Sequence, residues 1–174
     1  MEKELKREII YDGKILQLTK EEVELENGQH AYREVVYHNG GVCVLAVKNN
    51  QILLVKQFRY PNRLDTLEIP AGKLEKDEDP KTCALRELEE ETNYRASNMK
   101  FIMKTLPSPG YTSEWLYLYE AVDFQEVNDA LACDDDEFID VIWLNLDEAY
   151  QKVLNGDIVD AKTVIAIMYA YKNS

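Results

Sequence analysis

The chain has 174 residues, 45% of them hydrophobic, and a formal net charge of −13. This length suits one domain, or one domain with an appendage. A protein this acidic lacks the positive surface that binds nucleic acids or anionic membranes, so we exclude both as partners, and an anionic substrate would need a cation as mediator.

Hydrophobic runs and cysteines indicate the compartment. No apolar run approaches the roughly 18–20 residues that cross a bilayer. Residues 1–14 alternate in charge and lack the apolar stretch of a signal peptide. Cys43, Cys83 and Cys133 form no CxxC pair, which argues against a disulfide framework or a zinc site. We therefore expect a cytoplasmic protein.

The first forty residues predict an antiparallel β-meander. Its strands are expected at 6–11, 14–25 and 30–38, with tight turns at Asp12-Gly13 and Asn27-Gly28. The strands carry many charged residues and can bury little by themselves. We expect residues 1–40 to form a separate sheet that leans on a partner subunit, and residues 41–174 to form the main domain.

The main domain is predicted to be mixed α/β, with one helix inserted between strands. Residues 41–60 form two nearly continuous apolar arms around Asn49-Asn50, which predicts a hairpin of strands covered on both faces. Residues 61–72 are expected as a loop. The remaining elements are expected in this order: a helix from Pro80 to Thr92 capped by Asp79, strands at about 100–106, 115–123 and 140–146, a short helix capped by Asp147 and a last helix capped by Asp160.

The helix ends in RELEEETNY (residues 86–94), which crowds glutamates at a cost of a few tenths of a kcal/mol per like-charged i,i+4 pair. At about 3.6 residues per turn, Glu87 and Glu91 stack on one edge and Glu90 lies beside them. Arg86 is spaced to pair with Glu90. Carboxylates on one edge suit a hard cation such as Mg²⁺. Taken alone, however, the helix favours an ordinary solvated acidic face, because acidic helices are common. Glu89 points elsewhere and is expected to be solvated.

The wider spacing decides in favour of a cation site. Residues 72–94 fit the pattern G-x5-E-x7-R-E-U-x-E-E-x-G-U, in which U is a bulky apolar residue, at Gly72, Glu78, Arg86, Glu87, Leu88, Glu90, Glu91 and Tyr94. This stretch resembles the Nudix box, the signature of the Nudix hydrolases. Asn93 stands where the family has a glycine, and asparagine is the next-best residue for a left-handed helix end. The loop–helix–loop is therefore expected to survive the change.

Three further motifs resemble the ADP-ribose pyrophosphatase branch of that family: VKQFRYP (55–61), LEIPAGKLE (67–75) and LPSPGYTSE (106–114). The resemblance implies a Nudix fold, with a mixed β-sheet sandwiched by helices and an N-terminal antiparallel meander, and a homodimer with swapped N-terminal sheets. It implies Mg²⁺-dependent hydrolysis of the pyrophosphate bond of ADP-ribose or a related nucleoside diphosphate sugar, with Mn²⁺ as a possible replacement. Another nucleotide sugar such as GDP-mannose, or a non-catalytic nucleotide-sugar-binding module, stays as an alternative.

The resemblance also implies the metal-binding residues. Glu87 and Glu91 would be ligands, with Glu90 assisting and the carbonyl oxygen of Ala71 as a further ligand. Arg86 belongs to the same catalytic group as an orienting partner of Glu90. Glu78, near the helix start, is expected to support the loop.

A general base is expected from the acidic loop before the strand at 140–146. Asp135 and Glu137 resemble the family's pair of loop carboxylates, and the sequence does not separate them as the base. A loop tip without any catalytic role is the alternative.

For the substrate, the resemblance implies that Arg33 and Glu34 reach across the dimer to the nucleoside, and that Glu114 meets the sugar. Arg59 is expected to clamp a phosphate or to stack near the sugar, since a guanidinium suits bidentate phosphate contact. Trp115 and Trp143 are expected in the core.

Overall fold

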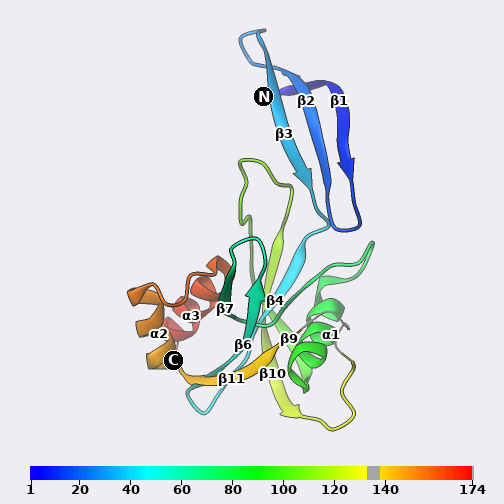
Figure 1. Cartoon of the computed structure of the whole chain (residues 1–174). Coiled ribbons are helices and arrows are strands. Elements are labelled where there is room, and N and C mark those ends of the chain that lie inside the picture. Colours follow the sequence, from blue (N-terminus) through cyan, green and yellow to red (C-terminus); the bar gives the residue numbers. More distant parts are fainter. Residues whose placement is uncertain (133–137, 174) are drawn as a thin grey trace. The chain divides into compact units, whose positions relative to one another are not determined.

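The computed structural model of the protein describes residues 1–132 and 138–173 (Figure 1). The chain forms two compact units. The first contains Met1–Gly40 and Leu106–Trp115, and the second contains Gly41–Thr105 and Leu116–Ser174. One boundary falls after Gly40, where the sequence suggested it. The return of residues 106–115 to the first unit was not indicated by the sequence.

The first unit is a three-stranded antiparallel sheet in the order β1-β2-β3, which confirms the predicted meander. Its strands are β1 (Lys3–Asp12), β2 (Gln17–Glu24) and β3 (His30–Tyr37). The segment 106–115 attaches to β3 by two backbone hydrogen bonds, from Val36 N–H to the Tyr111 carbonyl (2.7 Å) and from Ser113 N–H to the Val36 carbonyl (2.9 Å). Every residue of β1 is exposed, so this sheet has little core of its own.

The second unit contains two sheets. One has the order β8-β4-β10-β9, in which β4 and β10 are parallel and the other pairs are antiparallel. The other joins β11, β6 and β5, with β7 paired to β6. The bounds are β4 (Gly41–Leu45), β5 (Val47–Lys48), β6 (Gln51–Arg59), β7 (Leu64–Glu68), β8 (Ala71–Lys73), β9 (Tyr94–Thr105), β10 (Leu116–Glu126) and β11 (Asp140–Asn145).

Two predictions for residues 41–72 were wrong in part. The hairpin at Asn49-Asn50 exists, with both asparagines at positive φ (52° and 57°), but it joins only β5 to β6. Strand β4 pairs with β8 and β10 instead, because a continuous apolar run indicates burial on both faces without identifying the neighbouring strands. The expected loop at 61–72 contains strands β7 and β8, and its prolines lie outside both of them.

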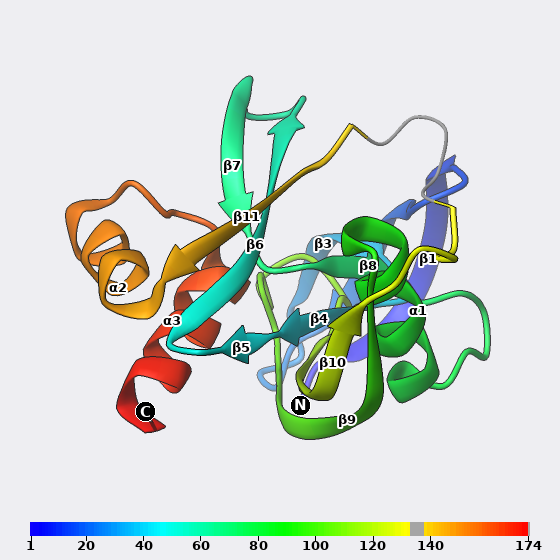
Figure 2. The same ribbon diagram turned by 90° about the horizontal axis from the view of Figure 1, so that it is seen from below.

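Helix α1 (Pro80–Thr92) covers one side of this unit, and helices α2 (Leu146–Asn155) and α3 (Ala161–Asn173) cover the other, as Figure 2 shows. Both α1 and α3 contact β4, so the mixed sheet lies between them. Leu88 of α1 belongs to one buried apolar cluster and Ile167 of α3 to another. The predicted mixed α/β fold, with its sheet between helices, is confirmed.

Of the predicted helix caps and buried tryptophans, some are confirmed by the structure and others were wrong. Asp160 caps α3 as predicted, since its carboxylate accepts a hydrogen bond from Thr163 N–H (3.0 Å). Helix α2 is capped by Asn145 rather than Asp147, because the buried Leu146 already lies in the helix. Trp143 packs between Tyr94 and Phe124 as predicted, at 5.6 and 6.1 Å between ring centroids.

Trp115 was wrongly expected in the core. Its exposed fraction is 38%, and it precedes β10, at the end of the segment that belongs to the first unit. No helix among residues 1–132 and 138–173 is long and apolar enough to span a membrane.

Candidate active site

Helix α1 carries the predicted carboxylates, and its ends lie at the predicted residues. The Asp79 carboxylate accepts a hydrogen bond from Thr82 N–H (2.9 Å) at the start. Asn93 adopts the left-handed conformation at the end (φ 60°, ψ 23°), and its N–H donates to the Glu89 carbonyl. Asparagine therefore makes the helix stop for which the motif has a glycine.

Arg86 lies at the centre of an acidic cluster on α1. Its Nη1 is 2.6 Å from Glu90 Oε2 and 2.8 Å from Glu87 Oε1, and its Nε is 3.2 Å from Glu78 Oε1. Burial works against the charged guanidinium, but the hydrogen bonds that Arg86 donates to Glu78 and the charge of Glu87 raise the pKa of Arg86. The predicted contact between Arg86 and Glu90 is present, and the same guanidinium also holds two further carboxylates.

Glu78 has the supporting role that the sequence suggested. Besides its contact with Arg86, its Oε2 accepts a hydrogen bond from Glu75 N–H (2.9 Å) in the loop before the helix. The carboxylate therefore fastens this loop to the central guanidinium of the cluster.

Glu87 and Glu91 lie against the backbone of strand β8. A Cβ atom added to Gly72 would stand 1.7 Å from the Glu87 carboxyl carbon, so the glycine leaves room for the Glu87 carboxylate in its present position. The Ala71 N–H donates to Glu91 Oε2 (2.9 Å), and Glu91 is 7% exposed. Residues 71 and 72 thus place both carboxylates beside the Ala71–Gly72 peptide.

The arrangement of these carboxylates bears on metal binding. Within residues 1–132 and 138–173, no three histidine, cysteine, aspartate or glutamate side chains are grouped so that they hold a metal ion. The glutamates point instead to Arg86 and to the Ala71 N–H. Their oxygen atoms and the neighbouring Ala71 carbonyl are the ligand type of hard cations, and Gly72 provides a cradle for Glu87. The donors therefore suit a hard divalent cation by their chemistry, and in the present arrangement they are held by Arg86 and the Ala71 N–H.

Glu89, expected to be solvated, is buried, with 6% of its surface exposed. Its two carboxylate oxygens accept from Nε and Nη2 of Arg95 (2.8 Å each), and Oε1 also accepts from Leu131 N–H (3.1 Å). The hydrogen bond from Arg95 lowers the pKa of Glu89. This carboxylate ties the chain that follows β10 to the helix, so its role is structural.

The two candidate bases, Asp135 and Glu137, lie outside the described residues. The chain that leads toward them is fixed at several points. Val127 N–H donates to the Asn93 carbonyl (2.9 Å), and Arg95 Nη2 donates to the Asp129 carbonyl (3.3 Å).

Arg59, predicted to contact substrate, ends strand β6 and pairs with Glu68 of β7. Its Nε and Nη2 donate to the two Glu68 oxygens at 2.6 Å each. Glu68 is 2% exposed and also accepts from Thr66 Oγ1 (2.6 Å) and from Lys162 Nζ. The motif LEIPAGKLE (67–75) contains Glu68 but indicates no role for it, and no motif contains Lys162. The sequence did not predict their contact because no sequence pattern connects strand β7 with helix α3.

Arg33, Glu34 and Glu114 all belong to the first unit. Arg33 forms an ion pair with Glu2 and donates to the Tyr32 carbonyl (3.0 Å). Glu34 is exposed on β3. Glu114 Oε1 lies 3.7 Å from His38 Nδ1. The structure therefore places these three residues in a different unit from the α1 cluster.

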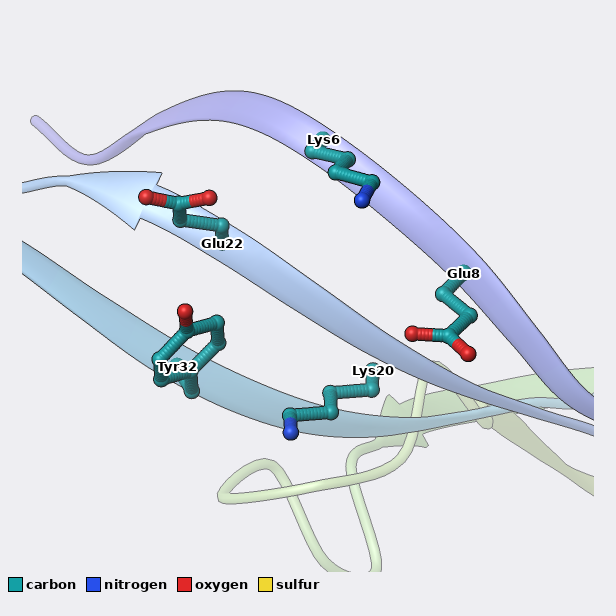
Figure 3. Close-up of a pocket in the computed structure, with 5 residues that line it drawn as sticks. All are labelled: Lys6, Glu8, Lys20, Glu22 and Tyr32. Atoms are coloured by element: carbon teal, nitrogen blue, oxygen red, sulfur yellow. The ribbon is translucent and has the colours of Figure 1, made fainter.

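The sheet of the first unit carries a shallow hollow of about 130 Å³ (Figure 3). It is lined by Lys6, Glu8, Lys20, Glu22 and Tyr32. The ammonium nitrogen of Lys20 lies 4.8 Å from the centroid of the Tyr32 ring. Because its two cations and two carboxylates offset one another, this hollow has no charge preference that indicates a ligand.

Known proteins share both the motif and the fold. The family model described as NUDIX domain matches residues 37–166, which include helix α1 and the Gly72 cradle. The chain belongs to the NUDIX domain family. Among solved structures, a Nudix-like fold recurs in one described as an ADP compounds hydrolase, with a TM-score of 0.86 and 20% identity, covering 98% of this chain and 92% of that one. At this identity the match concerns the fold alone.

Named relatives of this Nudix chain extend over most of its length. A methanol dehydrogenase activator of Bacillus methanolicus is 47% identical over 169 residues, covering 97% of this chain and 91% of the relative. An ADP-ribose pyrophosphatase of Bacillus subtilis is 43% identical with the same coverage. A GDP-mannose pyrophosphatase of Yersinia pestis is 32% identical over 148 residues, covering 79% of this chain and 74% of the relative.

Proposed function

We propose that this Nudix protein is a pyrophosphohydrolase of ADP-ribose or a closely related nucleoside diphosphate sugar. Water attacks one of the two phosphorus atoms and breaks its bond to the bridging oxygen. The products are a nucleoside monophosphate and a sugar phosphate. The α1 cluster carries the proposal, because it gathers three glutamates around Arg86 beside the Gly72 cradle. The ADP-ribose pyrophosphatase from Bacillus subtilis, at 43% identity, supports the substrate class.

The metal ligands we propose are Glu87, Glu90, Glu91 and the carbonyl oxygen of Ala71, for Mg²⁺ or Mn²⁺. The cation, when bound, neutralises charge on the diphosphate and lowers the pKa of a water molecule. Arg86 orients Glu90, and the Ala71 N–H holds Glu91. This assignment also explains how a chain of net charge −13 accepts an anionic substrate.

The remaining roles follow the motifs. We assign the general base to Asp135 or Glu137 and phosphate contact to Arg59, whose guanidinium lines a cavity of about 380 Å³. Arg33 and Glu34 are assigned to the nucleoside and Glu114 to the sugar. The compartment we propose is the cytoplasm, which rests on composition alone.

A homodimer formed through the N-terminal sheet is part of the proposal. The sheet exposes a set of large apolar side chains that a partner subunit would cover: Leu5, Ile9, Ile10, Tyr11 and Ile15. Light scattering is expected to give twice the monomer mass for the wild type and the monomer mass for Ile9→Lys. A monomeric wild type would remove the dimer from the proposal without touching the chemistry.

The function is tested by a substrate panel with product identification. The protein is incubated with Mg²⁺ and ADP-ribose, GDP-mannose or other nucleotide sugars, and kcat/KM is compared after chromatographic separation of the products. We expect AMP and ribose 5-phosphate from ADP-ribose. A higher kcat/KM for GDP-mannose would move the protein toward the activity of its Yersinia relative. Tight binding of ADP-ribose without cleavage would identify a binding module.

The relative named methanol dehydrogenase activator favours a second candidate function, the activation of a partner dehydrogenase. The two functions are separable. A dehydrogenase assay with and without this protein tests activation, and the Glu91→Gln variant tells whether activation needs the same cluster.

A further inference from the structure

The cavity beside Arg59 is lined by Glu68, whose carboxylate has a hydrogen-bond donor at every acceptor position. Glu68 Oε1 accepts from Arg59 Nε and Thr66 Oγ1, and Oε2 accepts from Arg59 Nη2 and Lys162 Nζ. A carboxylate offers about four lone-pair positions, so these four donors use all of them. Burial works to raise the pKa of Glu68, but the hydrogen bond from Arg59 and the charge of Lys162 hold it at about 2. Glu68 is therefore ionised and fixed in place.

Lys162 reaches Glu68 from the first turn of helix α3, and its side chain is 10% exposed. Its Nζ also lies 3.0 Å from Asp160 Oδ2. The next residue, Thr163, accepts a hydrogen bond from Ile69 N–H through its hydroxyl (2.8 Å). The start of α3 thus holds residues 68 and 69 by two adjacent side chains.

Arg59 uses only part of its guanidinium for Glu68. Nε and Nη2 donate to the carboxylate, whereas no acceptor among residues 1–132 and 138–173 takes a hydrogen bond from Nη1. The side chain is 40% exposed and lines the cavity of about 380 Å³. Because a guanidinium is planar, fixing one edge on Glu68 also fixes the direction of the Nη1 hydrogens.

The charges around this cavity balance only when Lys162 is present. Arg59 and Lys162 are positive, and Glu68 and Asp160 are negative. Without the ammonium group, two carboxylates and one guanidinium would remain, which disfavours an anionic group nearby. Glu68 would also lose one of its donors and could shift toward Arg59.

We propose that Lys162 is a positioning residue that acts through Arg59. It holds Glu68 so that the carboxylate orients the guanidinium, with Nη1 directed at a phosphate group of the substrate, and it cancels the excess negative charge of the cavity. This inference deepens the proposed function and rests on its substrate class. Neither Lys162 nor its contact with Glu68 belongs to the motifs that identified the site.

Binding is measured by calorimetry with Mg²⁺ and a non-hydrolysable analogue of ADP-ribose, in which a methylene group replaces the oxygen that bridges the two phosphorus atoms, and kinetics are measured separately with ADP-ribose and Mg²⁺. Lys162→Gln is expected to raise Kd and KM by about tenfold, as losses at buried charge pairs do, while kcat changes by less than about twofold. Lys162→Arg keeps the charge and is expected to restore most of the affinity. Lys172→Gln removes the same charge from an exposed position on α3 and serves as the matched control.

The decisive experiment is a double-mutant cycle with Arg59→Gln. If Lys162 acts through Arg59, Lys162→Gln weakens ADP-ribose binding in the wild-type background and adds less than about twofold in the Arg59→Gln background. Equal weakening in both backgrounds would overturn the inference, as would an unchanged Kd in a variant shown to be folded by circular dichroism.

A folding failure of Lys162→Gln does not end the test. Glu68→Gln/Lys162→Met then removes both buried charges together. This double variant must weaken binding in the wild-type background and leave it unchanged in the Arg59→Gln background. The proposed function fails separately, when the wild type neither binds nor cleaves any nucleotide sugar. Wild-type turnover that is indifferent to Lys162 overturns only the present inference.

Discussion

At the edge of helix α1 one guanidinium faces three carboxylates, whereas at the start of helix α3 one buried carboxylate faces two cations. The first cluster keeps excess negative charge after Arg86 has been shared, which suits a divalent cation. The second cluster satisfies Glu68 completely and leaves donors of Arg59 for an anion. A metal–diphosphate complex contains both kinds of charge, so the two clusters suit the two charged parts of the proposed ligand.

The two clusters also influence each other electrostatically. The hydrogen bond from Arg59 to Glu68 is the main reason that the pKa of Arg59 is raised, and the charges of Asp160 and Glu91 add to it. Glu91 belongs to the α1 edge, so its field reaches the guanidinium of the other cluster. Because the clusters are separate groups of side chains, a single substitution can disturb one of them and leave the contacts of the other in place.

The largest effect is expected from Glu91→Gln, which removes the charge of a proposed metal ligand while keeping the shape of the side chain. Turnover of ADP-ribose should fall by at least about 100-fold, and the Mg²⁺ concentration for half-maximal rate should rise. Initial rates across a Mg²⁺ titration measure both. Glu120→Gln, on an exposed pair with Lys100, is the control for removing one negative charge. Undiminished turnover in Glu91→Gln would refute the metal assignment.

Gly72→Ala tests the cradle of the α1 cluster. The new methyl group would stand 1.7 Å from the Glu87 carboxyl carbon, and the flexible end of Glu87 must move away. We expect a loss of about 10–100-fold in turnover, as for other changes in ligand orientation, with the fold retained by circular dichroism. Gly110→Ala meets no atom within 4 Å and is the control. Normal turnover in Gly72→Ala would show that the position of Glu87 does not matter.

The pH dependence of stability tests the second cluster. The folded-state pKa of Glu68 is about 2, below the ordinary 4.5, so its stabilising contribution is present above pH 4.5 and is lost as the pH falls toward 2. Wild type should exceed Glu68→Gln in the free energy of unfolding by on the order of 2 kcal/mol at pH 7, and the gap should narrow by pH 3. Urea titrations at both pH values measure the gap, with the exposed Glu126→Gln as control. A gap independent of pH would contradict the ionised Glu68.

The smallest effect on catalysis is expected from Glu89→Gln. Glu89 shares helix α1 with the glutamates proposed as metal ligands but faces Arg95 and Leu131. The melting temperature should fall by about 2–4 °C while kcat stays within about threefold. Thermal melts and initial rates on the same preparation separate the two quantities. A 100-fold loss of turnover would show that Glu89 takes part in catalysis, and the two sides of helix α1 would then not differ in function.

The sequence predicted helix α1 well because its signals are local. The cap at Asp79, the first-turn Pro80 and the stop at Asn93 all act within the helix or next to it. The contact of Arg86 with Glu90 follows from helical spacing for the same reason. The strands of the N-terminal meander were also placed well, since turn dipeptides act over a few residues. The strand expected at about 100–106 was placed wrongly at its start, because β9 begins at Tyr94, directly after the helix stop.

Contacts between different helices and strands could not be predicted from such local patterns. Lys162 lies 94 positions from Glu68, and nothing in either segment identifies the other. Arg95 is only six positions after Glu89, yet it lies past the helix end, where helical spacing no longer tells which side chains meet. The pairing of the two apolar arms around Asn49-Asn50 was predicted wrongly for the same reason, because an apolar run indicates that a strand is buried but does not identify the strand it pairs with.

The grip of helix α3 on residues 68 and 69 has a consequence for biosynthesis. The ribosome makes Arg59, Glu68 and the whole of helix α1 well before it reaches Lys162 and Thr163. Before helix α3 has been made, Glu68 lacks its ammonium partner and Ile69 lacks its hydroxyl acceptor. The contacts of Glu68 and Ile69 with helix α3 are therefore made later than the contacts within helix α1.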